Sequence, residues 1–530
     1  MSRPAAALGR AVGRAATAFP RLTLVALCLL LFLPGLRSIP PLDLGEATVA
    51  LLSRGLLAPG IPAAHEPPAA IHLLQAMSVR ALEALGLAHR SGIAAFRLPS
   101  MVAAVLLVLL VHHAGTRLVG ARAAFLSGAL LACSAGVVAV AHLATAQAPL
   151  LAALGAALGL LARAGARPDC FHARHAAAFW VAVAALLLLG GPGAAACPVL
   201  GAALLAWLEG RARWLRVLRP GWGLPAMALP ALSGLAPAWS APGTSALLVA
   251  LLPLAAFPGG LLAFAALPRL LAAGAPPVPR ALLAWAAAGL GAELGGAVPL
   301  GGLAALPPLM LAGASWALEP GPKGPTRLRA WPVALLLAAP AIALAGAAAS
   351  AALVDVRQLP VGVLVGAMAV LIVRGWAVHD LAGRPARAAG LAVLLAIPLY
   401  ASILEGTLAR LLIARAPQRV AGTAHTAVPG VPPEGIGLVG FGAAILFAAG
   451  PGARPLADGA EAARFLAEAP ARVVALHERE ERSFQLAAAA LGLRPQAHAE
   501  VLSVDPLSRA FFVAIVYTAG VEDAGRGGVR

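Results

Sequence analysis

Charged side chains are scarce in this 530-residue sequence. Asp, Glu, Lys and Arg make up 12% of the residues, about half the usual share of roughly 25% in soluble domains, whereas 61% are apolar. A soluble globular protein is excluded because it would need a charged surface, and a disordered chain is excluded because it would carry far fewer apolar residues.

Cysteine is also rare. The four cysteines lie far apart, in or near apolar segments, and have neither the spacing of a metal site nor that of a disulfide framework: Cys28, Cys133, Cys170 and Cys197. We interpret them as small apolar residues, which excludes a disulfide-rich scaffold.

Lysine is nearly absent. Lys323 stands alone, so the formal net charge of +17 comes from arginine. A nucleic-acid-binding protein would gather basic residues on a soluble domain. Here the arginines lie between apolar runs, as in loops at a membrane surface, and we predict no nucleic-acid partner.

Long apolar runs are abundant, and a helix that spans a bilayer needs about 20 mainly apolar residues. The first run, 22–36, follows Arg3, Arg10, Arg14 and Arg21. Because no small-residue cleavage site follows it, an uncleaved anchor is favoured over a signal peptide, and the N-terminus is predicted in the cytoplasm. Further candidate spans lie at 98–116, 122–143, 147–163, 176–190, 193–208, 221–236, 244–266, 280–294, 297–316, 331–351, 359–375 and 388–404.

The distribution of arginine supports this topology. Loops expected in the cytoplasm are rich in arginine, as in 209–219, whereas the opposite loops at 144–146, 190–193 and 237–244 carry no basic residue. The pattern predicts a multi-pass α-helical membrane protein with about 13 transmembrane helices and a C-terminus on the outer side. We assign residues 1–404 to this domain.

Two segments do not read as spans. Residues 37–97 form a long first outer loop with helical patterns at about 46–58 and 69–86, which we interpret as amphipathic helices at the membrane interface. Residues 405–530 are predicted to form a small α/β domain outside the cytoplasm. Its expected strands are 436–441, 444–448, 472–476, 497–504 and 511–516, and its expected helices are 459–467 and 480–491.

The first loop gathers acidic residues and histidines within about thirty residues: Asp43, Glu46, His65, Glu66 and His72. A carboxylate in a membrane-facing cleft can serve as the general base for an acceptor hydroxyl or amine. Carboxylate and imidazole together can also hold a divalent metal, for which Glu66 and His65 are candidates. The alternative from spacing alone is an ordinary helix start at Glu46 and a solvated loop around Glu66.

The order of short motifs carries a family resemblance. Residues 41–47 read P-L-D-L-G-E-A, 65–68 read H-E-P-P and 96–100 read F-R-L-P-S, each of the last two following a predicted helix. This order resembles bacterial glycosyltransferase family 39 and its relatives, the protein O-mannosyltransferases and the lipid A aminoarabinose transferase. The stretch 438–448 also resembles the small outer domain of many members.

The resemblance implies a GT-C fold in the cell inner (plasma) membrane. It implies a transfer of sugar from a polyprenyl-phosphate donor, which enters from the bilayer, to an extracytoplasmic acceptor that is a lipid, a glycan or a protein. Asp43, Glu46 and Glu66 would form the catalytic acidic set, and Arg97 would contact the donor phosphate.

Four polar positions depart from the family pattern. Gly45 stands where the usual catalytic Asp is expected, no Lys precedes Pro67, Gln147 replaces the Asp of a T-A-D stretch, and Gly190 lies where T-K-G-P would supply Lys. The hypothesis from sequence is therefore a membrane glycosyltransferase. The alternative is a catalytically inactive relative that binds lipid or assists an assembly.

Overall fold

The computed structural model describes residues 18–41, 45–57, 70–87, 92–233, 251–272, 274–295, 301–319, 385–410, 412–428, 430–504 and 511–519. The chain divides into two compact units, which we describe separately. The helical unit comprises Met1–Leu36, Pro67–Ile71 and Arg97–Thr407. The mixed unit comprises Arg37–Glu66, His72–Phe96 and Leu408–Arg530.

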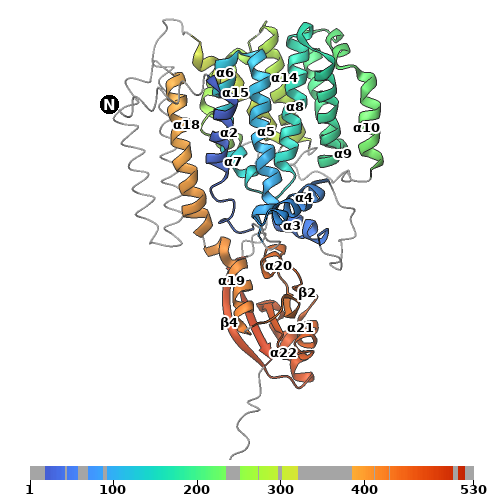
Figure 1. Cartoon of the computed structure of the whole chain (residues 1–530), viewed down its shortest axis with the longest axis vertical. Coiled ribbons are helices and arrows are strands. Elements are labelled where there is room, and N and C mark those ends of the chain that lie inside the picture. Colours follow the sequence, from blue (N-terminus) through green and yellow to red (C-terminus); the bar gives the residue numbers. More distant parts are fainter. Residues whose placement is uncertain are drawn as a thin grey trace, which may run out of the picture. The chain divides into compact units, whose positions relative to one another are not determined.

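The helical unit is built from helices labelled in Figure 1. Its α-helices are α2 (Pro20–Phe32), α5 (Ala94–Leu118, whose first turn begins in the mixed unit), α6 (Ala121–Ala132), α7 (Ala135–Ala141), α8 (Gln147–Ala166), α9 (Ala173–Glu209), α10 (Gly223–Leu232), α12 (Leu252–Ala255), α13 (Gly260–Leu270), α14 (Pro277–Leu294), α15 (Leu306–Leu318) and α18 (Pro385–Ala401). Short 3-10 turns lie at Pro168–Cys170, Arg213–Leu218, Pro220–Trp222 and Gly301–Ala305, and a π-helical turn lies at Ser402–Thr407.

Within the described residues, five helices are long and apolar enough to cross a membrane: Ala94–Leu118, Gln147–Ala166, Ala173–Glu209, Gly301–Leu318 and Pro385–Glu405. The pair α6 and α7, bent by 59°, makes a sixth if it is counted as one span. The chain is thus a multi-span helical membrane protein. The predicted spans 331–351 and 359–375 lie outside the described residues, so the count of thirteen stays a prediction.

Helix α9 contains a break. Its 37 residues would extend about 55 Å at 1.5 Å per residue, well beyond a hydrocarbon core of about 30 Å. Gly191, with φ 72° and ψ −169°, interrupts the helix in a conformation that other residues rarely adopt. The break lies where the sequence predicts the boundary between spans 176–190 and 193–208, so each half has the length of one span.

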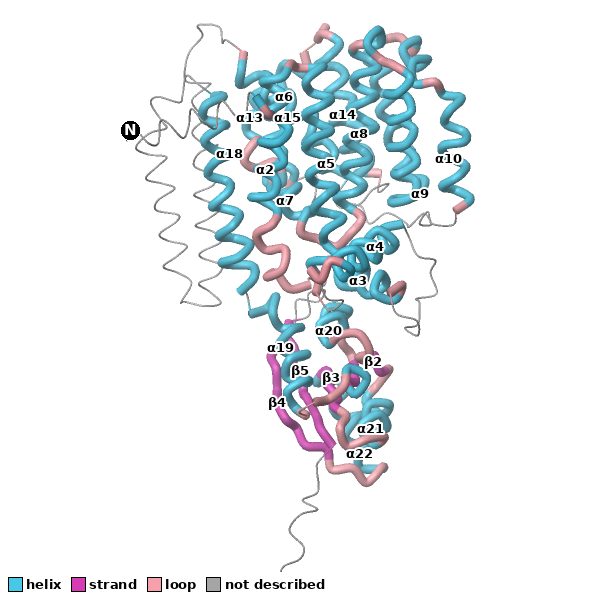
Figure 2. Tube along the Cα trace, viewed as in Figure 1, coloured by secondary structure: helices cyan, strands magenta, loops and turns pink. Residues whose placement is uncertain are grey.

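Close helix packing in the helical unit depends on small residues. Helices α8, α9 and α14 lie side by side, and α13 packs on α15 (Figures 1 and 2). A Cβ atom placed on Gly313 of α15 would lie only 2.8 Å from the backbone nitrogen of Ala263 in α13. Only glycine lets these two backbones come so close, as is typical of helices that pack within a membrane.

The mixed unit contains helices from the first loop and the C-terminal α/β region. Its helices are α3 (Glu46–Gly55), α4 (Ala70–Ala84, which begins in the helical unit), α19 (Leu412–Ala427), α20 (Ala443–Ala449), α21 (Gly459–Ala467) and α22 (Glu481–Ala490). Its strands are β1 (Ile436–Val439), β2 (Arg454–Leu456), β3 (Val473–His477), β4 (Pro495–Val504) and β5 (Phe511–Ala519). Short 3-10 turns lie at Leu408–Arg410, Pro433–Gly435 and Glu478–Glu480.

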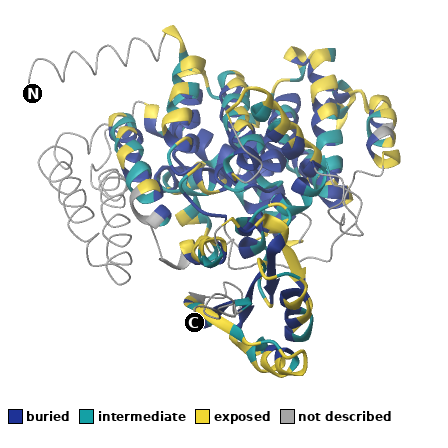
Figure 3. Cartoon of the chain, turned by 60° about the horizontal axis from the view of Figure 1, so that its bottom comes forward, coloured by how far each residue is buried: buried dark blue, intermediate teal, exposed yellow. Residues whose placement is uncertain are grey.

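The five strands form one sheet in the order β2-β1-β3-β5-β4. Strands β2, β1 and β3 run parallel, whereas β5 runs antiparallel to both of its neighbours. Along β3, Val473 and Ala475 face the core under α19 and α20, and Val474 and Leu476 face the core under α21 and α22. Helices thus cover both faces, and the buried strands lie between them (Figures 1 and 3).

One predicted strand is wrong. The run 444–448 forms helix α20, between Gly442 in an extended conformation and Gly450 with φ 101°. Its five apolar residues have no alternation, and its two alanines have little preference for a strand. Strand β2, which was not predicted, has only three residues and includes Arg454 and Pro455. The other predicted strands and both predicted helices of this region are present, with ends shifted by a few residues.

Candidate functional site

The predicted acidic set is described only in part. Asp43, His65 and Glu66 lie outside the described residues. Glu46 is the first residue of α3 and is fully buried, directly after Gly45 in the left-handed conformation. A carboxylate at a helix N-terminus is stabilised by the helix dipole, which is one reason that a buried acid is tolerated there.

Arg97, the predicted phosphate ligand, lies in the first turn of α5. Its side chain is fully buried, and Nη1 donates a hydrogen bond to the carbonyl oxygen of Leu36 at 3.1 Å. Arg97 belongs to the helical unit, whereas Glu46 belongs to the mixed unit. Each residue is thus a buried charged group within the segment 37–97. Burial of a charge is costly without partners, so both positions have more than a solubilising role.

A buried polar cluster connects α3 and α4. The Ser53 hydroxyl donates to Oε1 of Gln75 at 2.6 Å and lies 2.9 Å from Nδ1 of His72. Burial lowers the pKa of His72, while the backbone of Val49 acts in the opposite direction. The buried face of α4 thus holds His72 and Gln75 beside apolar residues such as Val79, whereas Leu73, Leu74 and Met77 are exposed.

Arg54 is the most unusual side chain of the mixed unit. It is 1% exposed, yet within the described chain its Nε and Nη2 atoms have no hydrogen-bond partner. Nη1 donates to the carbonyl oxygen of Phe447 at 3.2 Å, and the guanidinium lies 3.7 Å from the centre of the Phe447 ring. Burial lowers the pKa of Arg54 to about 10, so the group remains a cation at neutral pH.

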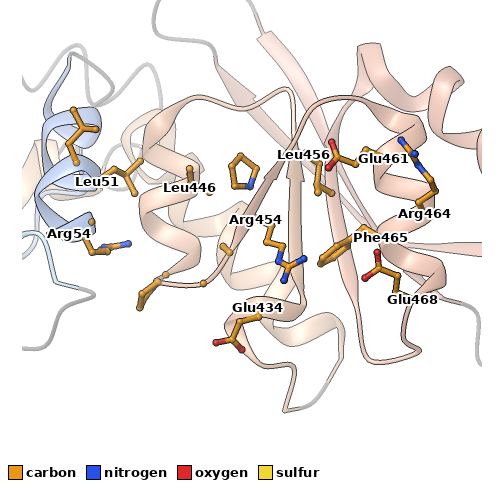
Figure 4. A pocket seen from close by; sticks show the side chains of 17 residues that line it. Leu51, Arg54, Glu434, Leu446, Arg454, Leu456, Glu461, Arg464, Phe465 and Glu468 are labelled. Atoms are coloured by element: carbon orange, nitrogen blue, oxygen red, sulfur yellow. The ribbon is translucent and has the colours of Figure 1, made fainter. Parts of the chain in front are cut away.

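Arg54 lines a cavity of about 920 Å³ that lies wholly within the mixed unit. Figure 4 shows Arg54 and Leu51 of α3 on one side of it, and Arg454 of β2 with Phe465 of α21 on the other. The sequence analysis missed this site. The signal was available, because Arg54 follows Ala47 and Ala50 at helical spacing on the buried face of α3.

The structure describes two of the positions that depart from the pattern, Gln147 and Gly190. Gln147 begins α8, and its Oε1 accepts a hydrogen bond from the Thr145 hydroxyl. The second, Gly190, lies just before the break in α9, where its neighbour Gly191 interrupts the helix. Near the C-terminal end of α14, the buried Glu293 accepts a hydrogen bond from the backbone of Gly302 at 3.1 Å. Each of these residues thus has a structural function.

No group of three or more His, Cys, Asp or Glu side chains suited to a metal ion occurs among the described residues. The predicted metal candidates, His65 and Glu66, lie outside them.

No protein family model matches the sequence, and no curated protein matches it. Solved structures do. The crystal structure of ArnT from Cupriavidus metallidurans bound to undecaprenyl phosphate superimposes with a TM-score of 0.67 at 16% identity, over 93% of this chain and 97% of that one. The apo structure of the same protein gives a TM-score of 0.67 at 17% identity, over 95% and 98% of the two chains. The resemblance predicted from the sequence is confirmed as a likeness of fold: this chain has the fold of ArnT along nearly its whole length.

Proposed function

We propose that this chain is a membrane glycosyltransferase that takes a sugar from a polyprenyl-phosphate donor and transfers it to an extracytoplasmic lipid, glycan or protein. The observation that carries the proposal is the fold shared with ArnT, a protein that has been crystallised with undecaprenyl phosphate. A lipid-linked donor enters from the bilayer, so its phosphate stays near the interface, where an arginine can bind it.

The proposed roles follow the sequence. Asp43, Glu46 and Glu66 supply the general base that removes the proton from the acceptor, and Arg97 holds the donor phosphate. Burial of Glu46 and Arg97 supports these roles, because a group shielded from water acts more strongly on a reacting charge. His65 and Glu66 are the residues proposed to hold a divalent metal if the reaction uses one.

The proposed setting is the inner membrane. We propose thirteen spans within 1–404, a cytoplasmic N-terminus after the arginine-rich start of the chain, and an outer side that holds the first loop, 37–97, and the domain 405–530. The association of α3 with α20 in one compact unit supports a common side for these two segments. The exposed Leu73, Leu74 and Met77 of α4 support the placement of this helix against lipid.

The first prediction concerns transfer by the purified chain in nanodiscs, from a radiolabelled polyprenyl-phosphate sugar to extracted envelope lipids and glycans. We expect Asp43→Asn and Glu46→Gln to lower the rate by about 100-fold or more, since a general base contributes about 10²–10⁴-fold. Glu500→Gln, at an exposed carboxylate on β4, is the matched control and should leave the rate unchanged. Full activity in both site variants would reject the assignment.

The second candidate function is a non-catalytic relative that binds a lipid or supports an assembly. The observation that favours it is Gln147, whose amide oxygen is hydrogen-bonded to Thr145 where the family pattern has a carboxylate. The same nanodiscs distinguish the two candidates. Binding of the polyprenyl phosphate without turnover of any donor tested would support the non-catalytic function.

A further inference from the structure

The cavity of the mixed unit has the composition of a ligand site. Its volume of about 920 Å³ falls within the range of about 300–1,000 Å³ of small-molecule pockets. Leu51 and Leu52 of α3 and Leu446 of α20 form apolar walls, and Phe465 adds an aromatic ring. These walls suit the apolar face of a sugar ring or a short aliphatic chain. The polar side chains of the cavity determine which charged group the ligand carries.

The arginines of the cavity have unused hydrogen-bonding capacity. Two nitrogen atoms of Arg54, Nε and Nη2, have no hydrogen-bond partner among the residues that the structure describes, although the side chain is 1% exposed. Arg454 and Arg464 also line the cavity, and their side chains have no hydrogen bond or ion pair to the described residues. An anion with several acceptor oxygens would satisfy the buried guanidinium and meet the two exposed ones.

The acidic residues around the cavity are mostly engaged elsewhere. Glu461 accepts a hydrogen bond from the backbone of Ala457 at 2.7 Å, near the start of α21. Glu468 is paired with Arg472. Glu434 is exposed, and Figure 4 shows it at the lower edge of the site. Two of the three carboxylates are thus already paired, while the arginines are available.

We propose that this cavity binds a phosphate monoester, with Arg54 and Arg454 as its principal ligands and Arg464 as a weaker contact. The phosphate oxygens accept from the fork of N–H groups on Arg54, and the rest of the ligand lies along the apolar walls. The source of the phosphate is either a soluble sugar phosphate or a lipid headgroup. This binding site is independent of the glycosyl transfer proposed above.

The test uses the full-length chain in phosphatidylcholine nanodiscs and measures binding by calorimetry. The soluble probes are inorganic phosphate and glycerol 3-phosphate, and the lipid probe is phosphatidic acid included in the nanodisc. We expect at least one probe to bind, with an affinity that falls as salt rises because the contact is ionic. If phosphatidic acid in the nanodisc competes with glycerol 3-phosphate, the natural ligand is a lipid headgroup. If it does not compete, the natural ligand is a soluble phosphate ester.

Variants test the residues. We expect Arg454→Gln and Arg54→Lys each to weaken binding by about tenfold or more. Arg454→Gln removes a charge-assisted hydrogen bond, whereas Arg54→Lys keeps the charge but loses the planar guanidinium. Glu434→Gln should tighten binding, because it removes a negative charge next to the phosphate. Arg494→Gln is the matched control, because it removes an exposed arginine of the same unit that does not line the cavity. Binding of none of the probes, or unchanged binding in both arginine variants, would overturn the proposal.

Discussion

Burial fixes the charge state of His72. In the folded protein this imidazole packs against Ser53 and has a lowered pKa, whereas in the unfolded chain it titrates near its ordinary value of about 6.5. The unfolded state therefore binds the proton more readily. The stability that His72 contributes is complete above about pH 6.5 and is lost as the pH falls below it.

We therefore expect the folded protein to be less stable at low pH. The melting temperature of the solubilised protein should fall between pH 7.5 and pH 5.5, and His72→Gln should reduce that fall by a few degrees. The control is His498→Gln, at an exposed histidine on β4, which should retain the wild-type pH dependence. Equal falls in all three proteins would contradict the role given to His72.

At the scale of residues, the sequence shows which charged side chains are unusual, but it does not show the role of each. Glu46 and Arg97 stand out because charge is rare in an apolar chain, and the structure buries both. The helical spacing of Arg54 after Ala47 and Ala50 indicates burial, but it does not indicate a ligand site. The significance of Arg54 depends on Phe447, 393 residues later, and no local pattern contains that contact.

The break in α9 belongs to the scale of elements. Gly191 has a backbone conformation that is accessible almost only to glycine, and a side chain there costs about 1–3 kcal/mol. We expect Gly191→Ala to lower both the yield of folded protein and the melting temperature. Gly390→Ala in α18 is the control, because a Cβ there meets nothing within 4 Å and alanine favours a helix.

Thermal unfolding in detergent measures both glycine variants. A Gly191→Ala protein as stable as wild type would show that α9 tolerates a regular helix at this point.

The elements predicted from the sequence differ in how well their ends are defined. Helix α21 matches its predicted range because Asp458 caps it and Glu461 completes the cap, a signature visible in the sequence. Helix α20 was mistaken for a strand because a short apolar run fits either structure. The missing alternation and the alanines favour the helix, and its packing against α3 and the sheet adds to that preference.

At the scale of the whole molecule, the mixed unit is discontinuous in sequence. Phe447 of α20 contacts Arg54 and packs edge-on against Phe96, with ring centres 5.6 Å apart. Residues 408–530 expressed alone lack both partners. We expect this fragment to melt at a lower temperature than the same region in the full chain, and to bind a hydrophobic dye.

Hydrogen exchange of β1 and β3, compared between fragment and full chain, checks this expectation. Replacement of Phe447 by serine in the fragment, where its partners are missing, should reduce dye binding. A fragment with full protection and no dye binding would show that α3 adds nothing to the stability of the sheet.

The sequence predicts the class of the whole molecule through the scarcity of charge and the alternation of arginine between loops. It does not predict which loop packs on which domain. That assembly depends on tertiary contacts such as the one between α3 and α20, which join segments that no periodicity relates.

The separation between Arg54 and Phe447 has a consequence for biosynthesis. A ribosome adding about 5–20 residues per second needs on the order of 20–80 seconds to add the 393 residues that lead from Arg54 to Phe447. Throughout that interval the face of α3 that contacts α20 in the folded protein has no α20 to cover it. The mixed unit can form only after the last quarter of the chain has been synthesised. Any stall in translation would therefore prolong the exposure of α3 to quality-control proteases.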